Sequence, residues 1–167
     1  WWYVCCGPNH PYANFFVDFP AIDHRILFWQ NWRFGVTGFL YWTTTYWPTN
    51  PFENVRQFPG ANGDGFLLYP GEEGPVESVR LEIIRDGIED YDYLSILSDL
   101  AERLSRLGRL GRDLALLREA RRALDVSDLV PSLTEYVKDP KALLERRDEI
   151  ARLIERLNRR LMNLSRL

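Results

Sequence analysis

Aromatic and polar side chains follow three apolar segments of the sequence, and together they could bind a sugar. Residues 41–47 (YWTTTYW) end one segment, residues 9–12 (NHPY) come after a second, and Tyr69 ends a third. Aromatic rings stack on the apolar C–H face of a sugar, while hydroxyl and amide groups bond to its edge. This mixture favours a carbohydrate ligand over a phosphate or a metal, although each ring is equally consistent with a hydrophobic core. The predicted sugar contacts are Trp42, Tyr46, Trp47 and Tyr69, with Asn9 and His10 as hydrogen-bond partners.

Other groups with acid or base chemistry occur in less informative positions. His10 has no partner nearby in the sequence. Glu72 and Glu73 lie in a turn, where we expect solvated carboxylates. Glu89 and Asp90 fall within a helical pattern, where pairing with Arg85 or another nearby base is the simpler interpretation.

The two cysteines, Cys5 and Cys6, are adjacent, and neighbouring cysteines rarely bridge because the geometry is strained. We expect two small buried thiols in a strand. The sequence contains no P-loop, Rossmann glycine motif, HExxH or GxSxG. We therefore predict neither a metal site nor a cofactor.

Composition describes a globular chain with two different halves. Of its 167 residues, 46% are hydrophobic and 27% charged, which distinguishes it from a disordered chain. A net charge of −3 gives no reason to expect nucleic acid, and no run of 18 uncharged apolar residues predicts a membrane span. All six tryptophans lie in the first 47 residues, whereas residues 80–167 are rich in Leu, Arg and Glu, as in long solvated helices.

The first half alternates strand and helix patterns. Apolar residues 1–6, 36–47 and 64–69 predict strands, and residues 20–35 predict a helix that begins at Pro20 and ends at Gly35. A turn-rich loop covers residues 48–63. Such a series predicts an α/β fold with a parallel sheet, either a (β/α) barrel or an open doubly wound sheet. Three strands alone leave exposed apolar edges, so we interpret the chain as the C-terminal piece of a longer protein. Its compartment is not predicted.

The second half predicts helices. Ser78 is a candidate N-cap for a helix from about Val79 toward Leu107, and Asp139-Pro140 is a strong start for the last helix. Residues 113–124 predict a further helix and 132–138 a short one. The last helix carries an apolar seam, and we expect it to pack on a seam of the first long helix. The two seams are Ile150, Ile154, Leu157, Leu161 and Leu164, and Leu94, Leu97, Leu104 and Leu107.

Three segments closely resemble the C-terminal part of the catalytic domain of glycoside hydrolase family 123, also described as domain of unknown function 4091. They are DHRILFWQNWRFGVTGFLYWTTTYW (residues 23–47), DGFLLYPGEEGPVES (64–78) and RLEIIRDGIEDYDYL (80–94). The resemblance covers roughly residues 1–100. It implies a (β/α)8 TIM-type barrel whose last three parallel strands and their helices form residues 1–107. An α-helical tail, residues 108–167, would pack on the last barrel helix.

The resemblance also implies hydrolysis of terminal N-acetyl-β-galactosaminides or related glycosides by a substrate-assisted retaining mechanism. In that mechanism the 2-acetamido oxygen attacks the anomeric carbon, and an adjacent Asp-Glu pair orients the acetamido group and acts as general acid and base. Asp148-Glu149 lies in the helical tail and does not match this pair. We therefore expect the catalytic pair upstream of this chain, with only part of the sugar-binding rim in it.

The segment 80–94 holds the strongest motif of the resemblance. Arg80 and Glu82 would lie near the start of a helix, on the active-site side of a barrel, whereas residues 85–91 would lock the helix to the barrel wall through Arg–carboxylate bonds. Two other functions remain open. One is a non-catalytic carbohydrate-binding or scaffold domain on the same frame. The other is an interaction protein, with weak self-association through the seam of residues 150–164.

Overall fold

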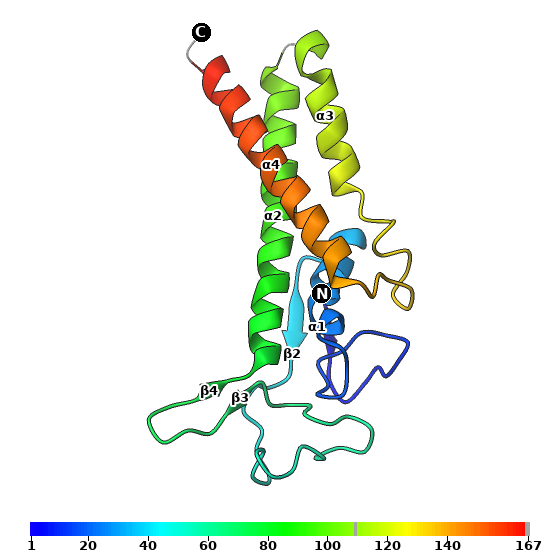
Figure 1. The fold of residues 1–167 in the computed structure, drawn as a ribbon, viewed down its shortest axis with the longest axis vertical. Coiled ribbons are helices and arrows are strands. Elements are labelled where there is room, and N and C mark those ends of the chain that lie inside the picture. Colours follow the sequence, from blue (N-terminus) through cyan, green and yellow to red (C-terminus); the bar gives the residue numbers. More distant parts are fainter. Residues whose placement is uncertain (109, 166–167) are drawn as a thin grey trace.

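The computed structural model describes residues 1–108 and 110–165, and it separates a region of short strands and loops from a region of long helices (Figure 1). Loops gather at the lower end of Figure 1, from which α2 extends upward beside α3 and α4. In chain order the elements are β1 (Trp2–Val4), α1 (Ala21–Arg33), β2 (Phe39–Tyr41), β3 (Leu68–Tyr69), β4 (Val76–Glu77), α2 (Val79–Leu107), α3 (Leu110–Leu124) and α4 (Pro140–Leu164). The chain is thus mixed α/β, as predicted. No helix in these two ranges is long and apolar enough to cross a bilayer.

The strands β1 and β2 pair in parallel, with Tyr3 opposite Leu40, and α1 connects them in the sequence. Successive side chains of a strand point to opposite faces. Val4 is buried on the face that packs on the helices, whereas Tyr3 is 55% exposed and Leu40 52% exposed on the other. The sheet is therefore covered on one face and open on the other.

The third predicted strand does not join this sheet, which corrects the expectation of three parallel strands. Only its end, β3, is extended, and β3 pairs antiparallel with β4 in a separate hairpin. One antiparallel bridge, Thr45 to Phe66, links this segment to the chain after β2. Gly63 and Gly65 both have φ +81°, a left-handed conformation that turns the chain where a straight strand was expected. In the described part of the chain, the parallel sheet has two strands and no closed barrel.

The helix starts agree with the capping residues in the sequence. The Ser78 hydroxyl accepts a hydrogen bond from the Leu81 backbone N–H at 3.2 Å, and α2 begins at Val79. The Asp139 carboxylate accepts from the Lys141 N–H at 3.0 Å, and α4 begins at Pro140. The short helix predicted for residues 132–138 is absent. Within that segment, the Ser132 hydroxyl instead bonds the backbone of the next residues, a local bond that competes with a helix.

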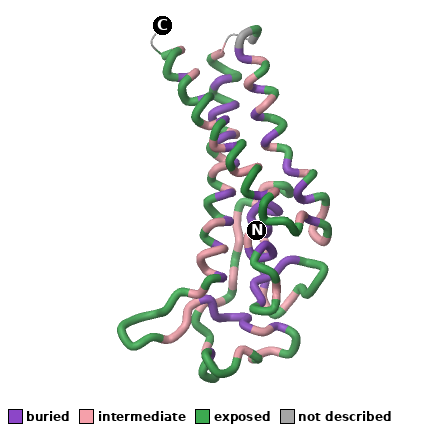
Figure 2. Tube along the Cα trace, in the orientation of Figure 1, coloured by how far each residue is buried: buried purple, intermediate pink, exposed green. Residues whose placement is uncertain are grey.

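The two leucine-rich seams meet within the chain, because α4 packs against α2. Buried positions recur along both helices (Figure 2). Leu94, Leu97, Leu104, Ile150 and Leu157 are each 0% exposed. The match is incomplete at the far end of α2, where Leu107 is 66% exposed.

A buried carboxylate joins three helices. Arg25 of α1 donates to Asp90 through Nε at 2.6 Å, and the Trp29 indole N–H donates to the same carboxylate at 2.9 Å. From α4, Arg147 approaches Asp90 at 3.1 Å and Glu89 at 3.0 Å. The expected Arg–carboxylate lock is therefore present, but its bases come from α1 and α4. Arg85 instead pairs with Glu82, one turn away on α2.

Candidate functional site

A buried aspartate connects the end of β2 to the loop that precedes β3. Asp64 is 1% exposed, and each of its carboxylate oxygens accepts one hydrogen bond. The Tyr41 hydroxyl donates to Oδ1 at 3.0 Å, and the Trp42 indole N–H donates to Oδ2 at 3.1 Å. The Gly65 backbone N–H then donates to the Tyr41 oxygen at 2.7 Å. These bonds fix the two aromatic residues at the carboxyl end of β2.

Three aromatic rings form what we call the aromatic platform: Trp42, Tyr46 and Phe58. The Trp42 ring lies 5.2 Å from that of Tyr46, and Tyr46 stacks on Phe58 at 5.9 Å with 22° between the planes. Trp42 is 42% exposed and Tyr46 40% exposed. The platform therefore presents ring surface to solvent from a fixed position.

The Trp42 ring lies directly over Gly65. A Cβ at Gly65 would lie 2.4 Å from the nearest ring carbon, so only glycine leaves room for the indole in this position. The positive φ of Gly65 is a second reason for glycine there. The Gly65 backbone and the Asp64 carboxylate thus together fix the position and the orientation of the Trp42 ring.

Arg80, in the first turn of α2, holds the loops below the platform. Its buried guanidinium donates to the backbone carbonyls of Phe15 at 2.7 Å and Gly63 at 2.9 Å, and also to that of Phe66. Burial lowers the pKa of Arg80. The three carbonyls belong to two loops far apart in sequence, and two of them flank Asp64 and Gly65. Arg80 thus lies near the start of a helix, as expected, whereas its place on the active-site side of a barrel stays a prediction.

Burial also sets the protonation of the site. Burial raises the pKa of Asp64, while the hydrogen bonds from Trp42 and Tyr41 act in the opposite direction by stabilising the carboxylate. Burial likewise raises the pKa of Tyr41, so its hydroxyl keeps its proton. The N–H of Trp42 and the O–H of Tyr41 are both used within the protein. A ligand would therefore meet the Trp42 ring face, not its indole N–H.

Two predicted contacts lie outside the aromatic platform. The Trp47 indole N–H donates to the Leu68 carbonyl at 2.8 Å, which ties the residue to β3. The Tyr69 ring packs 5.0 Å from Phe52 and 5.3 Å from Phe66. Through these contacts Trp47 and Tyr69 connect the loop of residues 48–63 to the hairpin of β3 and β4. Sugar binding by the two residues stays a prediction.

Asn9 and His10 diverge although they are adjacent. Asn9 is exposed and approaches the loop of residues 48–63, since a Cβ at Gly60 would lie 3.9 Å from its amide nitrogen. His10 stacks on Phe19 at 3.7 Å, and its Nδ1 lies 3.8 Å from the buried Asp23 carboxylate. His10 is thus packed at the start of α1, and nothing recorded brings it to the aromatic platform.

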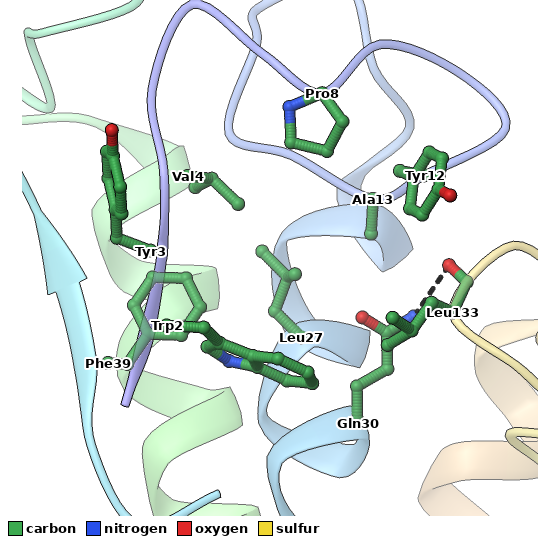
Figure 3. Close-up of a pocket in the computed structure, with 10 residues that line it drawn as sticks. All are labelled: Trp2, Tyr3, Val4, Pro8, Tyr12, Ala13, Leu27, Gln30, Phe39 and Leu133. Carbon is green, nitrogen blue, oxygen red and sulfur yellow. Dashed lines mark hydrogen bonds between the residues drawn. The ribbon is translucent and has the colours of Figure 1, made fainter. Parts of the chain in front are cut away.

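An apolar pocket lies between β1, α1 and the loop that follows β1 (Figure 3). Trp2 and Val4 point toward Leu27 in this view, whereas Tyr3 lies on the other side of the strand. The Gln30 amide donates to the Leu133 carbonyl at 3.3 Å. Among the described residues that line the pocket, none is charged, and the amide donor is already used. The pocket therefore offers less polar recognition than the ends of the strands.

The residues that sequence reasoning missed are Asp64, Gly65 and Phe58. The signal for the first two was the tripeptide Gly63-Asp64-Gly65, an acid between two glycines, which predicts a tight turn that buries or presents a carboxylate. No comparable signal marks Phe58. The expectation of two buried thiols in a strand was wrong. β1 ends at Val4, so both cysteines lie beyond the strand, and Cys6 is exposed.

The groups of the site do not form a metal centre. Among the residues that the structure describes, no cluster of three or more His, Cys, Asp or Glu side chains is placed to hold a metal ion. The chemistry that remains is an exposed aromatic surface supported by a buried carboxylate. Exposed rings on a rigid support are typical of carbohydrate recognition.

Comparison with known proteins agrees with this chemistry. The sequence model of the family described as glycoside hydrolase 123, catalytic domain, matches residues 1–97. The matched range runs from β1 into α2 and includes Trp42, Asp64 and Arg80. A search of curated proteins gives no match. Because the family match extends over more than half of the chain, the protein belongs to the glycoside hydrolase 123 catalytic-domain family.

Proposed function

We propose that this chain supplies part of the sugar-binding rim of a glycoside hydrolase that acts on terminal N-acetyl-β-galactosaminides or related glycosides. The reaction would follow the substrate-assisted retaining mechanism that the family resemblance implies. The observation that carries the proposal is the aromatic platform, whose exposed Trp42 and Tyr46 rings are held at the end of β2 by Asp64 and Gly65.

The fixed rings explain how such a rim would bind a sugar. A ring held in place loses little conformational freedom on binding, so more of the stacking energy appears as affinity. The Trp42 N–H is bonded to Asp64, which leaves the ring face for the C–H face of the sugar. The described structure records no hydrogen bond to the Tyr46 hydroxyl, which is therefore available for the edge of the sugar.

The proposal includes a (β/α)8 barrel frame, to which residues 1–107 would contribute strands and helices and residues 108–167 a helical tail. Two observations support it. The sheet of β1 and β2 is parallel, and Tyr3 and Leu40 on its open face are apolar and exposed, as on a barrel wall that lacks its neighbours. The family match also ends at residue 97, inside the proposed barrel part.

The catalytic Asp-Glu pair would come from another part of the protein. The matched residues 1–97 contain no Asp-Glu dipeptide, and the carboxylate at the platform, Asp64, uses both oxygens to hold Tyr41 and Trp42. Asp64 is therefore suited to positioning rather than to proton transfer. We expect the 167-residue chain alone not to hydrolyse a chromogenic β-N-acetylgalactosaminide. Turnover that a substitution within residues 1–100 abolishes would contradict this assignment.

Binding can be tested on the chain itself. Methyl N-acetyl-β-galactosaminide is titrated into protein labelled with ¹⁵N at tryptophan, and the indole N–H signals are followed by NMR. The Trp42 signal should move with sugar concentration, whereas that of the fully buried Trp29 should not. Isothermal titration calorimetry, which does not need the Trp42 signal, should show that Trp42→Ala weakens binding by about tenfold, or about 1.4 kcal/mol.

Phe34→Ala is the matched control for this substitution. Phe34 is 42% exposed, like Trp42, but it lies at the end of α1 and contacts Trp2 instead of the platform. Its loss should leave the affinity unchanged. Equal losses in the two variants, or no effect of Trp42→Ala, would remove the aromatic platform from the site. In a longer protein that holds the catalytic pair, Trp42→Ala should also lower kcat/KM.

A non-catalytic carbohydrate-binding domain is the second candidate. It is favoured by one observation: Asp64, the carboxylate that supports the platform, uses both of its oxygens to hold Tyr41 and Trp42. The two functions separate in the full-length protein. An Asp-Glu pair at the end of a middle strand, together with turnover, favours the hydrolase, whereas sugar binding without turnover favours the binding domain.

A further inference from the structure

The two cysteine thiols face the same side of the chain, which is unusual for neighbours that follow a strand. In extended backbone, successive side chains point in opposite directions. Here β1 ends at Val4 and the chain bends, with the Cys5 backbone N–H donating to the Gly7 carbonyl at 3.0 Å. The bend brings the two sulfur atoms to 4.0 Å.

A buried asparagine braces this bend. Asn14 is 0% exposed, and its side-chain amide donates to the Cys5 carbonyl at 3.1 Å and to the Pro8 carbonyl at 2.9 Å. Its own carbonyl oxygen accepts from the Phe15 backbone N–H at 2.7 Å. Every polar group of the Asn14 side chain is thus directed at the loop, so the paired arrangement of the thiols is part of the fold.

Both thiols can be reached, and they interact with each other. Cys6 is exposed and Cys5 is partly exposed. The hydrogen-bonding contact with Cys5 raises the pKa of Cys6, and the nearby Asp64 carboxylate acts in the same direction. Contact with Cys5 also raises the pKa of Tyr3. With their sulfur atoms 4.0 Å apart, the two thiols are close enough to react as one dithiol.

We propose that Cys5 and Cys6 form a reversible dithiol site that closes to a disulfide by exchange with a small-molecule disulfide such as oxidised glutathione. The thiolate of one cysteine attacks one glutathione sulfur, forms a mixed disulfide and releases one glutathione. The thiolate of the other cysteine then attacks the protein sulfur of the mixed disulfide and releases the second glutathione. Two electrons pass from the protein sulfurs to the reagent, and the two thiol protons end on the two glutathione molecules.

The closed form should be easy to reduce. The peptide bond that joins Cys5 to Cys6 is trans. Among the described residues, the cis peptide bonds are Gly7-Pro8 and His10-Pro11. Adjacent Cα atoms across a trans peptide are about 3.8 Å apart, shorter than the roughly 4.4–6.8 Å that relaxed disulfides span. Strain of this kind makes a disulfide labile and suits a regulatory bond more than a structural one.

Intact mass spectrometry of the folded chain tests the proposal. Oxidised glutathione should remove two hydrogens and leave no adduct, and a thiol reductant should restore the original mass. Cys5→Ser and Cys6→Ser keep one thiol each, so each should stop at a single glutathione adduct. In the reduced protein, phenylarsine oxide should bind once and bridge both sulfurs, and neither variant should retain it after washing with a monothiol.

The contribution of the fold is measured against a peptide of residues 1–10, which has the same cysteines without Asn14. The folded chain should close about tenfold faster, because the fold holds the two sulfurs together. Asn14→Ala should lower the rate toward that of the peptide. Two glutathione adducts on the folded chain, or closure no faster than in the peptide, would overturn the proposal. Neither result depends on sugar binding.

Discussion

Removal of the Arg80 guanidinium should destabilise the loops that support the aromatic platform. The loss should be larger than that from removing an exposed charge on the same helix. In Arg80→Met the methionine fills much of the space, but the carbonyls of Phe15, Gly63 and Phe66 lose their donor. Hydrogen bonds to charged groups contribute about 1.5–3 kcal/mol each. Part of this loss is offset, because the variant no longer buries a charge, and the lowered pKa of Arg80 reflects the cost of that burial. We expect the free energy of unfolding to fall by about 3 kcal/mol.

Urea unfolding, followed by tryptophan fluorescence, measures this loss. Arg85→Met is the matched control on α2, because the Arg85 side chain is 63% exposed and pairs with Glu82 at the surface. It should cost less than about 0.5 kcal/mol. Arg80→Lys keeps the charge, but an ammonium cannot replace the planar fork, so it should fall between the two. The Trp42 indole signal should shift in both Arg80 variants and stay in place in Arg85→Met.

A loss in Arg80→Met no larger than that in Arg85→Met would refute the reasoning. It would mean that the loop carbonyls find other donors, such as water, at no cost. An unchanged Trp42 signal in a destabilised Arg80 variant would refute a narrower point. It would show that Arg80 stabilises the chain without holding the platform in place.

The remaining predictions concern one turn, one buried histidine and the helical seam. Gly65→Ala should displace the Trp42 ring and its indole NMR signal, whereas Gly35→Ala, with φ +64° and nothing within 4 Å of its Cβ, should cost only about 1 kcal/mol and leave that signal unchanged. Burial lowers the pKa of His24, so the unfolded chain binds more protons than the folded chain, and stability should fall as the pH drops below about 6.5 toward the folded-state pKa. Urea unfolding at several pH values should show a weaker pH dependence of stability in His24→Gln than in the unchanged protein. An equal pH dependence in the two proteins would contradict this prediction. Leu157→Ala, at a position with no exposure, should cost about 2–5 kcal/mol in thermal or urea unfolding, whereas Met162→Ala, at a residue 60% exposed on the same helix, should cost under about 1 kcal/mol.

The seam result also bears on self-association. Leu157 is fully buried against the rest of the chain, and the seam that was considered for a partner is occupied by α2. A dimer through this seam would have to open the contact between α2 and α4. Weak self-association through the C-terminal helix stays a prediction, and light scattering over a range of concentrations tests it.

The sequence determined those features that depend on neighbouring residues. Ser78 and Asp139 cap α2 and α4 because their side chains reach backbone N–H groups two or three residues ahead. The periodic leucines defined the seams, and the motif segments defined the family. Capping and periodicity act over one or two turns, so a single segment contains the whole signal.

Only the tertiary structure decided which groups meet. Glu89 and Asp90 have Arg85 within helical reach, yet Asp90 is bound by Arg25 from 65 residues away, because the packing of α1 against α2 buries Asp90 beside Arg25. In the same way, Asp64 supports Trp42 across 22 residues because two glycines turn the chain back toward β2. The partner of a buried polar group is set by the packing of whole elements, and sequence spacing does not encode that distance.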